Sequence, residues 1–174
     1  LEALRLDVLL QQHELDLQIA LGRALMAARG YSAPVVGDTL VRARALAERF
    51  DRPDRLAPLL YSQWGFHSVR AEHELAVSLA EQMEQLGETR KDQATLLLGH
   101  YIHGASCHYR GEFVTARALL ELCDGLRDPA ARAICAAIAV ADPHAASLGH
   151  LALTLALLGH LDQGRARVDE ALSE

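Results

Sequence analysis

The pattern that predicts the fold is clearest in residues 108–121, HYRGEFVTARALLE. Gly111 breaks a helical stretch there, and Ala116, Leu120 and Cys123 follow it at offsets of 5, 9 and 12 residues. Apolar residues spaced i, i+4, i+7 lie on one face of a helix. The stretch therefore predicts a turn followed by an amphipathic helix, whose apolar face has to pack against a neighbouring element.

The same arrangement occurs at three other places along the chain. Ala71 and Gly159 are followed by small or apolar residues at the same offsets, and Gly30 is followed by them one residue later, after a turn lengthened by Ser32–Pro34. The residues in these positions are Ala76, Ala80 and Met83; Gly164, Val168 and Ala171; and Val36, Leu40 and Ala43. We interpret the small residue of each turn as one that lets two backbones approach closely. A recurring hairpin of this kind is typical of a helical solenoid.

The predicted fold is all-α, a right-handed solenoid of about four helix hairpins within a single domain, 1–174. Its repeat units lie at approximately 13–50, 56–87, 92–126 and 143–174, and together they hold roughly eight helices. Pro53 and Pro58 are expected to interrupt the connection between the first two units, because proline cannot continue a preceding helix. Asp142 before Pro143 predicts the start of a helix in the last unit.

Composition narrows the classes of function. The formal net charge is −6, the pI is near 5.8, and no cluster of Lys and Arg stands out, which argues against direct nucleic-acid binding. Neither a signal peptide nor a run of apolar residues long enough for a bilayer is present, so no membrane partner is expected. Three cysteines without metal-like spacing suggest a reduced, cytoplasmic protein. Because the chain begins at Leu1 and ends within a helical run, we expect it to be part of a longer protein.

One family resemblance covers nearly the whole chain. Residues 14–46, ELDLQIALGRALMAARGYSAPVVGDTLVRARAL, closely resemble a tetratricopeptide (TPR) repeat region of bacterial multidomain proteins. In those proteins the repeats accompany an AAA-type P-loop ATPase together with an adenylate/guanylate cyclase domain or a LuxR-type DNA-binding domain. Later stretches resemble the same region in the same order: residues 60–82, 108–121 and 150–172. The chain departs from the family at Val140 and Ala141, where the family tends to have tyrosine and glycine.

The resemblance implies a non-catalytic interaction or sensor module, acting as the regulatory arm of a signalling ATPase. The P-loop pattern GxxxxGK[ST] and the paired carboxylates of cyclase chemistry do not occur in this sequence, so no catalytic residue and no cofactor are predicted within it. A free-standing TPR adaptor protein is the alternative. A more remote alternative is a metal-dependent enzyme with His100, His103 and Cys107 as ligands, since these residues share one helical face.

The candidate binding surface is a groove lined by the first helix of each hairpin. In the third unit, Tyr101, Ala105, His108 and Tyr109 lie on one face of such a helix, and in the second unit the corresponding face offers Tyr61 and Ser68. Aromatic and histidine side chains suit a peptide or a small polar ligand, and we expect a protein or peptide partner in the groove. An alternative explanation is that these residues are ordinary packing or solvated positions.

Residues 148–158 form a segment that is apolar on nearly every side. A helix of that kind is either enclosed within its own chain or in contact with another one. The sequence therefore allows a homodimer.

Overall fold

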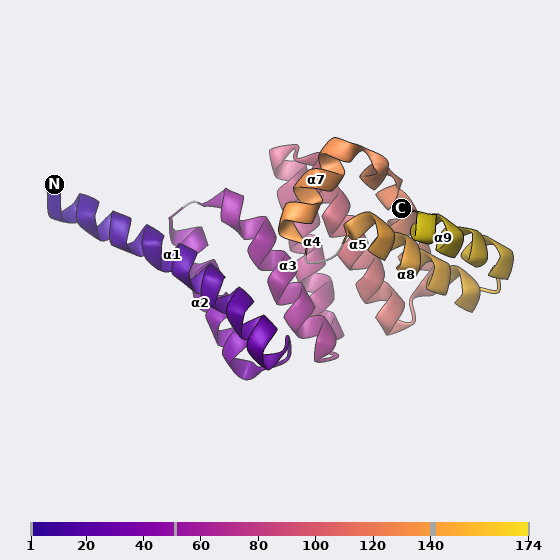
Figure 1. Ribbon diagram of the computed structural model, residues 1–174, viewed down its shortest axis with the longest axis horizontal. Coiled ribbons are helices and arrows are strands. Elements are labelled where there is room, and N and C mark those ends of the chain that lie inside the picture. The colour runs from indigo at the N-terminus through magenta and orange to yellow at the C-terminus, as the bar shows by residue number, and fades with distance from the viewer. Residues whose placement is uncertain (1, 51, 140–141, 174) are drawn as a thin grey trace. The chain divides into compact units, whose positions relative to one another are not determined.

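The computed structural model describes residues 2–50, 52–139 and 142–173, and nearly all of them are helical (Figure 1). No strand occurs among these residues, and helices adjacent in the chain pack as pairs, so the all-α class and the hairpin organisation are confirmed. The chain divides into two compact units, residues 1–72 and 73–174. This boundary falls within the predicted repeat unit 56–87. The division into four repeats and the right-handed sense stay predictions.

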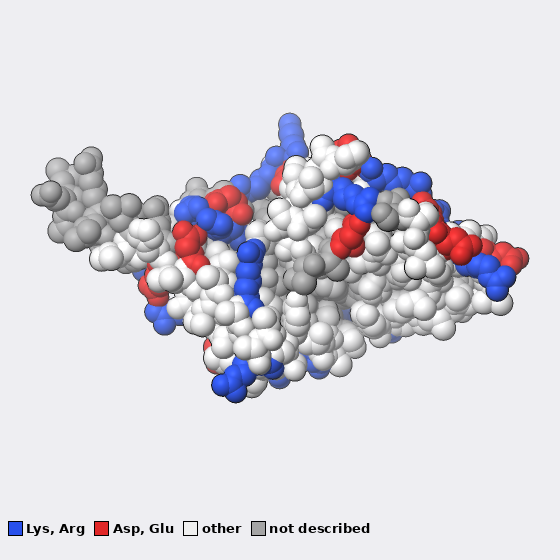
Figure 2. Space-filling model, in the orientation of Figure 1, with Lys and Arg blue, Asp and Glu red and all other residues white. Residues whose placement is uncertain are grey.

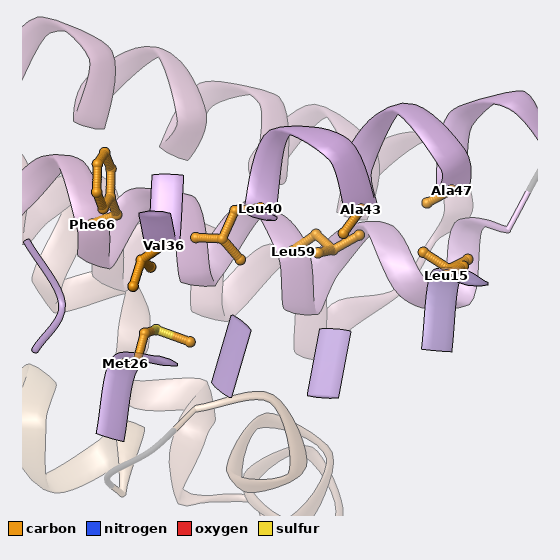
Figure 3. Packing of buried hydrophobic residues seen from close by; sticks show 8 residues of the cluster. All are labelled: Leu15, Met26, Val36, Leu40, Ala43, Ala47, Leu59 and Phe66. Atoms are coloured by element: carbon orange, nitrogen blue, oxygen red, sulfur yellow. The ribbon is translucent and has the colours of Figure 1, made fainter. Parts of the chain in front are cut away.

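Unit 1 consists of α1 (Glu2–Arg29), α2 (Pro34–Arg49) and α3 (Pro53–Val69), with α2 packed against both of the others. Figure 3 shows its core, to which all three helices contribute. The predicted apolar stripe of α2, Val36, Leu40 and Ala43, lies at the centre of this core and is buried. Burial of such a stripe is the main source of stability for an amphipathic helix.

The described residues of unit 2 form six α-helices and one short 3₁₀ segment. The α-helices are α4 (His73–Arg90), α5 (Gln93–Arg110), α6 (Phe113–Glu121), α7 (Pro129–Ile138), α8 (Pro143–Leu157) and α9 (Leu161–Ser173), and the 3₁₀ segment η1 is Leu122–Arg127. The helix α5 contacts α4, α6, η1, α7 and α8. Because neighbours surround it, α5 is buried on almost every side.

The four turn residues that the sequence singled out share one backbone conformation. Gly30, Ala71, Gly111 and Gly159 all have a positive φ, between 57° and 86°. A Cβ atom built on any of the three glycines would meet no atom within 4 Å. The interpretation that these residues are small so that backbones can approach closely is therefore wrong. They end helices in the left-handed conformation, which is nearly free of strain only for glycine.

Close approach of helices occurs at other glycines. A Cβ on Gly87 of α4 would lie 2.6 Å from the backbone nitrogen of Leu96, and one on Gly99 of α5 would lie 2.9 Å from the backbone nitrogen of Glu84. These two glycines let α4 and α5 cross nearly backbone to backbone. Gly164 of α9 plays the same part against α8, where the carbonyl oxygen of Ala152 would lie 2.9 Å from a Cβ.

Aspartates cap the starts of three helices in unit 2. Asp142 accepts a hydrogen bond from the backbone N–H of His144, and Pro143 occupies the first turn, as predicted. Asp92 and Asp128 cap α5 and α7 in the same way. In unit 1 the expectation for proline is partly wrong: α3 begins at Pro53, and Pro58 lies inside the helix. Pro58 is the sixth residue of α3, so its missing N–H removes one hydrogen bond early in the helix.

The connection between α6 and α8 contains more regular structure than the sequence predicted. The chain leaves α6 as the 3₁₀ segment η1 and then forms the additional helix α7. Cys123 of the predicted stripe is buried as expected, but it belongs to η1 and not to an α-helix. The departure from the family at Val140 and Ala141 lies outside the described residues.

Candidate functional site

Aromatic and histidine side chains from four helices of unit 2 form one cluster. His73 begins α4, Tyr101, His108 and Tyr109 lie on α5, Phe113 begins α6, and His150 lies on α8. Their ring centroids are 5.5–6.1 Å apart in successive pairs. Such distances are typical of edge-to-face and offset-stacked aromatic contacts. We call these six residues the ring cluster.

Hydrogen bonds determine which nitrogens of the ring cluster carry a proton. The carbonyl oxygen of Ala146 lies 2.9 Å from Nδ1 of His150 and can only accept, so this nitrogen bears the hydrogen. The neutral ring then accepts at Nε2, which lies 3.2 Å from the hydroxyl oxygen of Tyr109. Thr154 donates its hydroxyl proton to the carbonyl oxygen of His150, and its oxygen accepts from Nδ1 of His108 at 2.8 Å.

Burial keeps the histidines between α5 and α8 in the neutral form. Desolvation lowers the pKa of His108, and the nearby His150 lowers it further. Desolvation also lowers the pKa of His150, although its hydrogen bond to Ala146 acts in the opposite direction. Near neutral pH this pair therefore offers uncharged, amphipathic rings.

Four of the six predicted groove residues lie on this face of α5, and the structure gives them different degrees of access. Tyr101 is 5% exposed and Ala105 is fully buried, because α5 is surrounded within unit 2. His108 is half-buried, and Tyr109 is 54% exposed. Tyr109, with the edge of His108, is thus the part of the predicted surface that a ligand can reach. His150 and His73 were not predicted, because no spacing rule links them to α5.

The other two predicted groove residues, Tyr61 and Ser68, lie on α3 in unit 1 and are half-buried. The ring of Tyr61 lies 5.4 Å from that of Trp64, and burial raises the pKa of its hydroxyl to about 12. The Oγ atom of Ser68 is buried and has no hydrogen-bond partner among the described residues. These two side chains are therefore placed for packing more than for contact with a ligand.

A second polar cluster joins α4 to α5. Glu84 accepts hydrogen bonds from Nδ1 of His100 at 2.8 Å and from Nδ1 of His103 at 3.1 Å, and all three side chains are mostly buried. The hydrogen bond to Cys107 and then that to Glu84 raise the pKa of His103 to about 10. Burial alone raises the pKa of Glu84, but hydrogen bonds from both histidines bring it down to about 2. The cluster is a mostly buried carboxylate that is hydrogen-bonded to two histidines, and the protonated His103 forms an ion pair with it.

This cluster contains the histidines of the remote metal hypothesis, but it is organised around a carboxylate. Both Nδ1 atoms are directed at Glu84, and Cys107 is buried. Among the residues that the structure describes, no group of three or more His, Cys, Asp or Glu side chains is placed to hold a metal ion. His100 and His103 serve to join α4 to α5.

Unit 1 contains a cavity that sequence analysis did not anticipate, with a volume of about 300 Å³ between α2 and α3. Arg70 lies at its rim, with its guanidinium 5.1 Å from the centre of the Phe66 ring and a hydrogen bond of 2.8 Å to Glu72. His67 also lines the cavity and is hydrogen-bonded to Glu72 at 2.6 Å. Nδ1 of His67 and Nε of Arg70 are thus both occupied by Glu72, so these two atoms are not free to bind a ligand.

In comparisons with known proteins, no protein-family model, no curated protein sequence and no solved structure matches the chain. Within the described segments, none of the helices has the length and apolar character needed to cross a membrane. The fold and the ring cluster define an all-α protein of helix hairpins with an aromatic and histidine surface.

Proposed function

We propose that the chain is a non-catalytic module of the TPR type that binds a protein or peptide, and that it serves as the regulatory arm of a cytoplasmic bacterial signalling ATPase. The ring cluster is the observation that carries the proposal. It lies between α5 and α8, which are the first helices of the predicted third and fourth hairpins. In the TPR proteins that the sequence resembles, the first helices line the binding groove.

Access and chemistry within the ring cluster fit the recognition of a peptide. The Tyr109 ring is exposed on one side, while its hydroxyl is held by His150. A rigid tyrosine provides a large contact area at a small cost in conformational entropy, and such side chains are enriched in protein interfaces. The neighbouring Arg110, paired with Glu74 and Glu112, supplies a polar rim.

The regulatory mechanism would be differential binding. A partner held at Tyr109 shifts the output domain only by the difference between its affinities for the two states of the protein. The ATPase, together with its cyclase or DNA-binding output domain, comes from the family resemblance alone.

The first experiment is to read the open reading frame on both sides of this segment. A P-loop ATPase in the same frame, with a cyclase or helix-turn-helix domain, is the expected result. A frame that encodes these residues without an ATPase would contradict the regulatory arm and favour the free-standing adaptor.

The second experiment tests the binding surface in the intact protein. Tyr109→Ala should change the response of the ATPase rate to the partner by roughly fivefold or more, the usual lower range of coupling between sites. Val114→Ala is the matched control, since Val114 is also an exposed apolar residue but lies on α6. Equal responses of the two variants would show that the ring cluster is not the binding surface.

A further inference from the structure

The last helix of unit 2, α9, carries an apolar face that its own unit leaves uncovered. Leu161, Val168 and Leu172 are 67%, 44% and 81% exposed. Val168 occupies the repeat position that Leu40, Ala80 and Leu120 fill in the earlier hairpins, and those three residues are buried. The exposed face thus has the character of a packing surface.

The spacing of this face is that of a helix that packs against another helix. Leu161, Arg165, Val168 and Leu172 follow one another at intervals of four, three and four residues. This alternation is the heptad spacing of a coiled-coil seam. Leu153 and Leu157 of α8, in the same hairpin, are exposed as well.

Two charged residues on α9 identify the kind of partner. Arg165 and Asp169 are exposed, and neither has an ion-pair partner among the described residues, whereas Arg167 of the same helix is paired with Glu170 at 2.9 Å. Figure 2 shows both signs of charge on the surface of α9. A partner that satisfies Arg165 and Asp169 needs an acidic and a basic group at matching positions, and a second copy of α9 provides both.

We propose that α9 is a homodimer interface at which two copies of the chain pair their α9 helices in antiparallel orientation about a two-fold axis. In this arrangement Leu161 of each copy lies opposite Leu172 of the other. Each Arg165 then packs over Val168 of the other copy, beside its Asp169. The interface is self-complementary, as an isologous two-fold contact requires. The proposal is independent of the ring cluster and of the proposed ATPase.

Charge reversal tests this arrangement with the whole chain in sedimentation equilibrium at increasing concentration. The unmodified protein should form dimers reversibly. Arg165→Glu places two acidic groups together at each contact, and Asp169→Arg places two basic groups together, so each variant alone should raise the dissociation constant at least about tenfold. An equimolar mixture of the two variants should regain a one-to-one dimer, because opposite charges then meet at both contacts.

Arg90→Glu provides the control for net charge, since Arg90 is exposed on α4 and the substitution changes the net charge by the same amount as Arg165→Glu does. Its dimer should persist. Circular dichroism checks that all variants keep their helices, which is expected because the substituted side chains are exposed. The proposal is overturned if the unmodified chain stays monomeric, or if the single variants dimerise as well as the mixture does.

Discussion

Ala71 is strained by its own methyl group. It ends α3 with a φ of 57°, a conformation that places Cβ close to the following carbonyl oxygen. The corresponding turns at Gly30, Gly111 and Gly159 avoid this strain. Lys91, between α4 and α5, has a φ of 54° and is a further strained turn that the sequence pattern did not reveal.

Ala71→Gly is therefore expected to raise the free energy of unfolding of unit 1 by about 1 kcal/mol. The greater backbone entropy that glycine gives to the unfolded chain offsets a small part of this gain. Urea denaturation followed through Trp64, the only tryptophan of the sequence and a buried residue of unit 1, measures the change. Ala24→Gly in the exposed interior of α1 is the control, and it should lower the same free energy by about 1 kcal/mol. A loss of stability in both variants would contradict the strain at Ala71.

At the scale of elements, the crossing of α4 and α5 depends on Gly87 and Gly99. The side that each glycine leaves open is filled by backbone of the other helix, which cannot rotate away as a flexible side chain can. The hydrogen bonds of Glu84 with His100 and His103 lie at the same crossing. Close backbone contact and a shared buried charge thus stabilise the same pair of helices.

Gly99→Ala should lower the free energy of unfolding of unit 2 by about 1–3 kcal/mol, because α4 has to move away from the added methyl group. Gly149→Ala is the matched control within α8. A Cβ there meets no atom within 4 Å, so the better helix propensity of alanine should raise stability by about 1 kcal/mol. Thermal unfolding followed by far-ultraviolet circular dichroism distinguishes the two variants. Similar shifts for both would show that α4 and α5 are not in close contact at Gly99.

At the scale of the whole molecule, folding shifts the pKa values of three histidines of unit 2 in opposite directions. His103 has a folded pKa of about 10, above its unfolded value near 6.5, so its contribution to stability is complete below pH 6.5 and is lost as the pH rises toward 10. His108 and His150 have lowered pKa values, so their unfolded forms take up protons first and stability is lost as the pH falls below 6.5.

These two effects predict a maximum in the stability of unit 2 near pH 6.5. The free energy of unfolding, measured by urea denaturation between pH 4.5 and 9.5, should fall on both sides of it. In His103→Gln, the fall in the free energy of unfolding above pH 6.5 should become smaller, and the fall below pH 6.5 should be unchanged. In His150→Asn, only the fall below pH 6.5 should become smaller. An unchanged alkaline slope in His103→Gln would mean that His103 is not protonated against Glu84.

The ring cluster shows how much of a site the sequence reveals. The faces of α5 could be predicted, because residues three and four apart share a helical face whatever surrounds it. The sequence could not predict which of those residues a ligand can reach, because access depends on helices that come from elsewhere in the chain. The additional helix α7 and the segment η1 pack against α5, and His150 comes from α8.

The sequence by itself determined most of the helices, the four turns at Gly30, Ala71, Gly111 and Gly159, and the buried apolar stripes of α2, α4 and α6, since local periodicity and backbone preference decide these features. Only the tertiary structure decided why the turn residues are small, where helices touch backbone to backbone, and which histidines are charged. Each of these depends on atoms far apart in the chain: the open space around Gly111, the backbone of Glu84 against Gly99, and the carboxylate of Glu84 beside His103. Long-range packing and desolvation are properties of the folded neighbourhood, and no local pattern encodes them.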